Sequence, residues 1–314
     1  MDCNTGLFMP QLITGLMLGF LYALIALGYT MVYGVLKLIN FAHDAVFMLG
    51  SVAVFYVFGL ALGAEPVSGV TLAAMLLAVL IVGGIASALA AGGLELSAYR
   101  PLRRRGAARL SYLISAIGAS FFATYLMQQS FNNDFFLGPA RRTFPQVMAS
   151  DTAFNVFDTN VLNIDVVLIV TAIVCFVLLD RLINQTRTGR SIRALSEDIV
   201  ASQLMGVNVT RVIVTTFLIG GFFGGVAGVL NGMRFGFVEW DVGFLPGIKA
   251  FTAAVLGGIG NIRGAMLGGL ALGVIENVSA VCIGSEWKNV VAFSVLVLVL
   301  ILRPTGILGE RIGG

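Results

Sequence analysis

The segment from Lys37 to Gly50, KLINFAHDAVFMLG, places the only histidine of the chain next to an acidic residue. These residue types could serve acid-base catalysis or metal binding, but the rest of the sequence supports neither. One histidine supplies too few ligands for a metal cluster, and neither a His-Glu-x-x-His nor a Gly-x-Ser-x-Gly motif is present. We therefore expect no enzyme activity, no catalytic residues and no metal site in this chain.

The three cysteines support the same view. Cys3, Cys175 and Cys282 lie far apart, with the second inside an apolar run. Their spacing predicts neither a metal site nor a disulfide framework. We interpret them as small residues of helices.

The composition indicates that this chain is a membrane protein. Hydrophobic residues make up 58% of the 314 residues and charged residues only 11%, whereas a soluble domain is about one-quarter charged. Apolar stretches of about 20 residues, enough to cross a hydrocarbon core as a helix, recur along the whole length. We predict an all-α, polytopic membrane bundle of about eight or nine transmembrane helices, forming one domain over residues 1–314.

Charge then predicts the orientation of the helices. Ten of the 19 Lys and Arg residues fall in the segments 100–109 and 181–211, which is typical of cytoplasmic loops and makes nucleic-acid binding improbable. The N-terminus and the polar 132–160 loop then face outward. A short, glycine-rich seventh stretch could be re-entrant. The predicted spans are 10–33, 43–62, 67–97, 110–131, 162–182, 212–233, 247–262, 264–282 and 289–303.

Glycine is unusually abundant, with 39 residues, many of them four apart. Such spacing predicts small helix faces that let backbones approach closely in lipid. The first packing column is Gly220, Gly224, Gly228 and Gly232. A second column, Gly260, Gly264 and Gly268, forms only if the helix there is continuous.

No glycine-rich loop continues into Gly-Lys-Ser/Thr, so we expect the chain to have no ATP-binding P-loop of its own.

The histidine segment has a structural and a functional interpretation. Asn40 can be the N-cap of a new helix, and Asp44 then lies in the first turn, where a carboxylate complements the helix dipole. A helix that starts inside the membrane can also expose its amides to a carboxylate-bearing solute. Residues 247–258 align weakly with residues 40–51, which suggests a second helix start facing the first across a translocation path. The predicted path residues are Asn40, His43, Asp44, Lys249, Thr252 and Glu276.

Ionisable residues within spans are candidates for function because lipid makes them costly. Glu276 is the deepest of them and could serve proton coupling or pair with a neighbouring helix. Glu95 and Asp165 lie near span ends, and we expect both to reach water.

A polar stretch between two spans predicts contact with a partner protein. In residues 183–211, Ser196 can cap a short helix whose first turn contains Glu197 and Asp198 and which ends at Gly206. The helix has an apolar side, including Ala201, although it lies outside the membrane. A helix lying flat in the interface, or packed on its own bundle, is the alternative.

Four segments closely resemble the permeases of high-affinity branched-chain amino-acid ABC importers: GFLYALIALGYTMVYGVLKLINFAH (19–43), SYLISAIG (111–118), TGRSIRALSEDIVASQLMGVN (188–208) and FTAAVLGGIGNIRGAMLGG (251–269). The resemblance extends to RPTGILG (303–309). It implies a multi-pass protein of the bacterial inner membrane, with a second similar permease, two cytoplasmic ATPases that use ATP and a periplasmic binding protein as partners. It also assigns Glu197, Ala201 and Gly206 to a loop that couples to an ATPase.

Other transport functions remain as alternatives. The family also contains urea and short-chain amide permeases, and Asp44 stands where a glycine is usual, which disfavours an anionic group nearby. A secondary transporter would be expected to carry more intramembrane carboxylates, and a channel would be expected to show a filter sequence. Neither class explains an amphipathic cytoplasmic helix.

Overall fold

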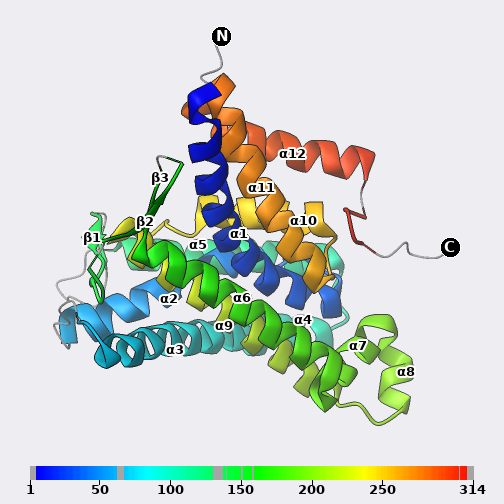
Figure 1. The fold of residues 1–314 in the computed structure, drawn as a ribbon. Helices are drawn as coiled ribbons and strands as arrows, with labels where there is room; N and C mark the ends of the chain where they lie inside the picture. Colours follow the sequence, from blue (N-terminus) through cyan, green and yellow to red (C-terminus); the bar gives the residue numbers. More distant parts are fainter. Residues whose placement is uncertain are drawn as a thin grey trace. The chain divides into compact units, whose positions relative to one another are not determined.

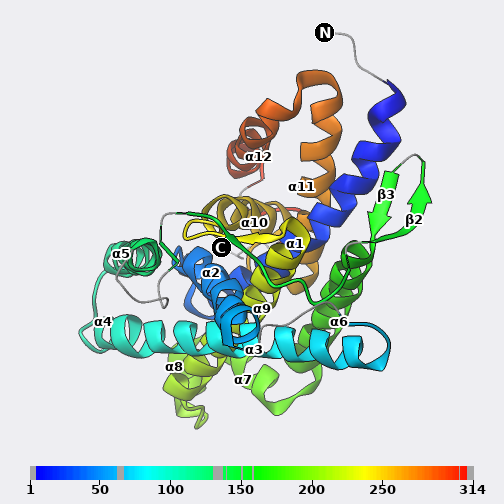
Figure 2. The ribbon, with the colours of Figure 1, turned by 90° about the vertical axis from the view of Figure 1, so that its left-hand side faces the viewer.

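The computed structural model is a helical protein, with two short two-stranded sheets among the residues it describes (Figures 1 and 2). Within the same residues, eight helices are long and apolar enough to cross a membrane, which confirms the predicted polytopic bundle. These are Phe8–Leu36, His43–Leu60, Val70–Arg104, Arg109–Gln128, Asn163–Gln185, Val209–Phe235, Ile262–Ile283 and Ser285–Leu302. The structure describes residues 5–61, 67–129, 137–138, 140–149, 151–157, 159–303 and 305–309.

The α-helices are α1 (Phe8–Leu36), α2 (His43–Val54), α3 (Val70–Leu94), α4 (Arg100–Arg104), α5 (Arg109–Gln128), α6 (Asn163–Gln185), α7 (Arg187–Glu197), α8 (Ile199–Leu204), α9 (Val209–Phe235), α10 (Phe244–Gly257), α11 (Ile262–Ile283) and α12 (Lys288–Leu302). Two π-helical segments, η2 (Phe55–Ala61) and η3 (Glu95–Tyr99), continue α2 and α3. Two 3-10 turns, η1 (Thr5–Leu7) and η4 (Ser285–Trp287), precede α1 and α12. Strand β1 (Arg142–Thr143) pairs antiparallel with β4 (Phe237–Val238), and β2 (Thr152–Val156) with β3 (Thr159–Leu162).

The chain forms two compact units. One contains Met1–Thr30, Ser150–Asp180 and Ile248–Gly314, and the other contains Met31–Ala149 and Arg181–Gly247. In the second unit α9 packs along α2 and α3, and both figures show α3 and α9 side by side. We call this second unit the α9 unit and the first the α11 unit.

Glycines allow the close approach in the α9 unit. Gly220, Gly224, Gly228 and Gly232 are all buried in α9. A Cβ atom at Gly224 would lie 2.9 Å from the His43 ring, and one at Gly232 would lie 2.5 Å from the Phe144 ring. At Gly228 it would overlap the carbonyl oxygen of Phe47. The column therefore lies where α2 and the 140–149 loop press against α9.

In the α11 unit, glycines of α1 and α11 likewise meet, because a Cβ at Gly15 would lie 2.7 Å from the carbonyl oxygen of Gly273. The condition for a second glycine column, a continuous helix, is not met. A turn that includes Gly260, whose φ is +98°, separates α10 from α11, so only Gly264 and Gly268 lie on a helix. With 14 residues, about 21 Å long, α10 is too short to cross a hydrocarbon core of about 30 Å.

The expectation for the cysteines was wrong for one of them. Cys282, near the end of α11, is disulfide-bonded, whereas Cys175 in α6 is a buried free thiol. Cys3 lies outside the described residues. Sequence spacing could not reveal this bond because cysteines far apart in the chain can be neighbours in the fold.

Candidate translocation site

Helix α2 begins at His43 after a break that follows α1, as the sequence predicted, but its N-cap is Ala42 rather than Asn40. The side-chain oxygen of Asn40 accepts hydrogen bonds from the backbone N–H of Ala42 at 3.1 Å and from the Tyr99 hydroxyl at 3.0 Å. Asn40 is thus buried and holds the turn before the helix to η3. Asn40 is therefore not the N-cap of α2: its side-chain oxygen bonds to Tyr99, a residue far away in the sequence.

The start of α2 lies beside the middle of the transmembrane helix α9. His43 packs against Gly224, which is near the centre of the 27-residue helix α9. Phe47, one turn further along α2, packs against Gly228. The first turn of α2 therefore lies about halfway through the span, the depth at which transporters with broken helices bind their solutes.

The start of α10 lies next to the start of α2. Gly243 directly precedes α10, and a Cβ atom there would overlap the carbonyl oxygen of Asp44. The sequence predicted a second helix start near residue 247, and α10 begins at Phe244. The starts of α2 and α10 are neighbours.

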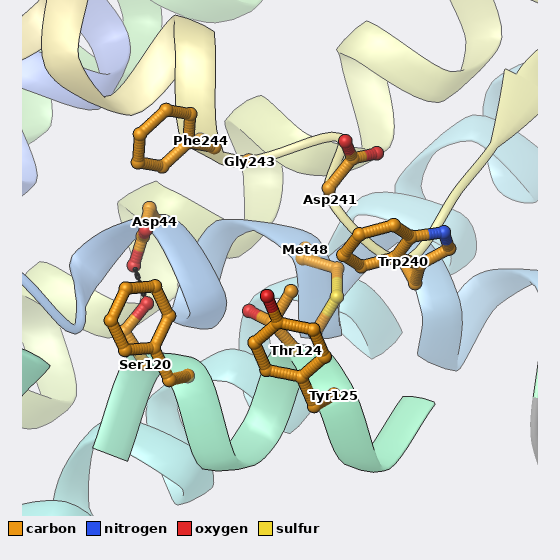
Figure 3. Close-up of a pocket in the computed structure, with 10 residues that line it drawn as sticks. Asp44, Met48, Ser120, Thr124, Tyr125, Trp240, Asp241, Gly243 and Phe244 are labelled. Atoms are coloured by element: carbon orange, nitrogen blue, oxygen red, sulfur yellow. Dashed lines mark hydrogen bonds between the residues drawn. The ribbon is translucent and has the colours of Figure 1, made fainter. Parts of the chain in front are cut away.

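A cavity of about 200 Å³ opens beside these helix starts. Figure 3 shows that its walls come from α2, from one face of α5 and from the chain that leads into α10. Two of the lining side chains are carboxylates and four are aromatic, and none is a lysine, an arginine or a histidine. The lining residues are Asp44, Met48, Ser120, Phe121, Thr124, Tyr125, Trp240, Asp241, Gly243 and Phe244.

Hydrogen bonds and ring stacking hold the cavity walls. Oδ1 of Asp44 accepts hydrogen bonds from the Ser120 hydroxyl at 2.7 Å and from the backbone N–H of Ala45 at 2.6 Å. The rings of Tyr125 and Trp240 stack with centroids 5.8 Å apart and planes at 29°. Asp241 lies at the exposed side, where desolvation and then the charge of Glu239 raise the pKa of its carboxyl group. The site is therefore preorganised and acidic.

The predicted path residues of α10 and α11 form a cluster within the α11 unit. Lys249 donates a hydrogen bond to Oε1 of Glu276 at 2.6 Å, and both side chains are nearly fully buried. Beside them, Lys288 donates to Asn277 at 2.7 Å. Thr252 is fully buried and its hydroxyl donates to the backbone of its own helix. Glu276 thus has an internal cation, the pairing that the sequence left open.

Two further carboxylates, Glu95 and Asp165, were expected to reach water, but both are buried. Glu95 is fully buried in η3 and forms an ion pair of 2.6 Å with Arg103. Asp165, in the first turn of α6, is 2% exposed and accepts a hydrogen bond from the backbone N–H of Leu162 at 3.2 Å. Both lie near helix ends, as predicted, but each has folded back onto a local partner instead of extending to solvent.

The predicted coupling segment, residues 183–211, contains two short helices rather than one. Ser196 is not a cap: it lies in the last turn of α7 and its hydroxyl donates to the carbonyl of Arg193 at 2.7 Å. Glu197 is the last residue of α7, and Asp198 is the N-cap of α8, accepting from the N–H groups of Val200 and Ala201 at 2.7 and 3.0 Å. The correction follows from hydrogen-bond geometry, since the carboxylate replaces the hydroxyl at the start of the helix.

The end of the short helix is as predicted. Gly206 has a φ of +82°, the left-handed conformation that favours glycine after a helix, and its N–H donates to the carbonyl of Gln203 at 3.0 Å. Figure 1 shows α7 and α8 beyond the end of α9. The apolar side chains of the segment are exposed: Ile199 (44%), Val200 (65%), Leu204 (84%) and Met205 (84%).

Sequence reasoning missed most of the cavity. Ser120, Tyr125, Trp240 and Asp241 come from segments that are far apart in the chain and show no shared motif. One signal was available: Trp240 and Asp241 are a polar-aromatic pair between two apolar spans, directly before the short glycine-rich stretch.

Comparison with known proteins identifies the class of this helical membrane protein. A family model described as "Branched-chain amino acid transport system / permease component" matches residues 11–300. The chain therefore belongs to this family, which confirms the resemblance seen in its sequence. It is a transport permease subunit rather than an enzyme, and a multi-pass protein of the bacterial inner membrane.

Individual relatives agree with the family match. The chain is 43% identical to the high-affinity branched-chain amino acid transport system permease protein BraD of Pseudomonas aeruginosa, covering 96% of each chain. It is 42% identical to the corresponding LivH proteins of Salmonella typhimurium and of Escherichia coli K12, again covering 96% of each chain. A part of the chain, 35%, is 34% identical to the fructose import permease protein FrcC of Rhizobium meliloti. No solved structure matches the chain.

Proposed function

We propose that this chain is one permease subunit of an ATP-driven importer for branched-chain amino acids, leucine, isoleucine and valine, or closely related amino acids. Similarity over nearly the whole chain to relatives named for high-affinity transport of these solutes supports the proposal. We infer that a second similar permease completes the path, that a periplasmic protein delivers the solute and that two cytoplasmic ATPases supply the energy. ATP is then used only in those partners, and this chain needs no cofactor.

One observation of the structure supports the ATPase partner most directly. Helix α8 lies outside the eight long apolar helices, yet it exposes several large apolar side chains. An exposed apolar patch on a short, well-capped helix is typical of a docking surface for another protein. In this proposal α8 inserts into a groove of an ATPase subunit.

The contacts of α8 offer a route for the energy to reach the site. After Gly206 the chain turns directly into α9, whose first turn is capped by Asn208. The glycine face of α9 in turn contacts His43 and Phe47 at the start of α2. A displacement of α8 by an ATPase would therefore move the helix against which the cavity is built.

The decisive variant is Gly206→Val in the purified importer reconstituted into liposomes. A β-branched residue strongly disfavours the positive φ at this position, although a Cβ would meet no atom within 4 Å. We expect substrate-stimulated ATP hydrolysis and solute uptake to fall at least tenfold. Wild-type coupling in this variant would contradict the proposed role of α8.

Gly106→Val is the matched control. Gly106 also has a positive φ, +61°, and open space around its Cβ position, in the turn between α4 and α5. We expect it to cause a comparable local strain without loss of coupling. Leu204→Ser, which changes only an exposed side chain, should in addition lower the recovery of the ATPase with a tagged copy of this chain.

A further inference from the structure

The cavity beside α2 has the chemistry of a site for a positively charged group. Asp44 and Asp241 bring two carboxylates to its wall, and no cationic side chain is among the lining residues. Around them stand the rings of Phe121, Tyr125 and Trp240. Carboxylates together with the faces of aromatic rings attract ammonium groups, and the attraction is stronger where water is excluded.

The helix start itself disfavours the opposite charge. A helix that begins in the middle of a membrane commonly directs its amides at the carboxylate of a solute. Here the carboxylate of Asp44 already lies in the first turn and accepts the Ala45 N–H at 2.6 Å. A second anion at the same place would meet this negative charge, whereas a cation would be attracted to it.

The dimensions suit a small ligand. The cavity has a volume of about 200 Å³. This volume accommodates an amino group with a short branched alkyl chain, and Met48 and Phe244 provide apolar surface for such a chain.

We propose that this cavity binds the protonated amino group of the transported solute, so that the permease recognises its cargo by the ammonium end. The inference rests on the proposed function and deepens it, because it names which part of an amino acid the membrane subunit reads. Ser120 acts as a positioning residue: its hydroxyl donates to Asp44 at 2.7 Å and fixes the carboxylate toward the cavity. Figure 3 shows this hydrogen bond and the carboxylate of Asp241 on the same cavity.

Intrinsic fluorescence of the full-length purified chain can test the proposal. The chain has two tryptophans, and Trp240 lines the cavity, so the Trp287→Phe variant leaves a reporter at the site. The probes are isopentylamine, which has an ammonium but no carboxylate, isovalerate, which has a carboxylate but no ammonium, and leucine. We expect saturable changes with isopentylamine and leucine and none with isovalerate. The Trp240→Phe variant should show no response.

Asp44→Asn keeps the shape of the side chain and removes its charge. We expect its affinity for isopentylamine to fall tenfold or more, and that of Asp241→Asn to fall about threefold because this carboxylate is more exposed. Asp151→Asn, which changes an exposed carboxylate that is not among the lining residues, is the matched control and should bind as the parent does. If Asp44→Asn does not fold, Asp241→Asn together with the isovalerate comparison decides the question.

Unchanged binding of isopentylamine in well-folded Asp44→Asn, or equal binding of isovalerate, would overturn the inference. The fluorescence measurement needs no ATPase, so it fails independently of the proposed importer. Amine binding without a copurifying ATPase would support the cavity and contradict only the importer. Coupled leucine uptake without amine binding by the chain would contradict only the cavity.

Discussion

Asp44 and Glu276 are both carboxylates within membrane helices, but their surroundings differ in one respect. Glu276 is buried against the ammonium of Lys249 at 2.6 Å, so its charge is balanced by the protein itself. Asp44 receives hydrogen bonds from Ser120 and Ala45 and lines a cavity without a basic side chain. This difference underlies the proposal that the Asp44 cavity takes its cation from a ligand, whereas Glu276 has Lys249.

The largest expected effect lies on the balanced side of this comparison. Lys249→Met would leave Glu276 buried without its cation, and breaking a buried ion pair in this way costs about 3–5 kcal/mol. We expect the free energy of unfolding in detergent to fall by that amount. The double change Lys249→Met with Glu276→Leu should recover most of the loss. A single variant as stable as the parent would show that the pair is not a structural element.

A change at the contact between the two helix starts should have the next largest effect. Gly243→Ala places a methyl group against the Asp44 carbonyl, and overpacking of this kind costs about 1–3 kcal/mol. We expect lower stability together with weaker isopentylamine binding, because the cavity wall must move. Gly118→Ala on α5, where a Cβ would meet no atom within 4 Å, is the control and should be neutral or slightly stabilising. Unaltered amine binding by Gly243→Ala would show that the contact between Gly243 and Asp44 does not affect the binding site.

Ser120→Ala tests the Asp44 side of the comparison. It removes one hydrogen bond to the Asp44 carboxylate, worth about 1 kcal/mol, while the charge stays in place. We expect about a fivefold loss of isopentylamine affinity, measured by the fluorescence of Trp240. Ser120→Thr, which keeps the hydroxyl, should restore binding. A serine with a purely structural role would instead lower the melting temperature and leave the affinity unchanged.

The smallest effect is expected for an exposed ion pair. Arg263 contacts Asp180 at 3.2 Å, but the arginine side chain is 69% exposed. Surface pairs of this kind contribute about 0–1 kcal/mol. Arg263→Gln should therefore leave the free energy of unfolding almost unchanged at moderate salt. A loss as large as that of Lys249→Met would mean that burial does not explain the difference between the pairs.

The sequence predicted the long helices well because hydropathy over about 20 residues reports directly on contact with lipid. The predicted 110–131 span, for example, is α5 at Arg109–Gln128, and even the weak 247–262 segment overlaps the short α10 at Phe244–Gly257. Helix ends were less predictable. Asn40 is not a cap because its side chain bonds to a distant partner, Tyr99, and Ser196 is not a cap because Asp198 takes that position at the start of α8.

The candidate site could be predicted only in part. Asp44 and the helix start came from a local pattern, since caps and first turns are set by neighbours in the chain. The other walls of the cavity, such as Tyr125 and Trp240, depend on how helices pack, and one sequence does not specify those pairings. The ion pair between Glu95 and Arg103 could have been predicted, because a spacing of eight residues places two side chains about two helical turns apart on the same side of a helix.

The position of the α2 start has a consequence for the electrical behaviour of transport. Because His43 lies beside the centre of α9, a cation that enters the cavity from either face crosses about half of the membrane potential. One charge moved through 100 mV corresponds to about 2.3 kcal/mol, so occupancy of this cavity by an ammonium should change by about 1.2 kcal/mol, or about sevenfold, per 100 mV. A zwitterionic amino acid carries both charges on one carbon atom, so its net charge is zero, and this voltage dependence should be seen with isopentylamine and almost vanish with leucine.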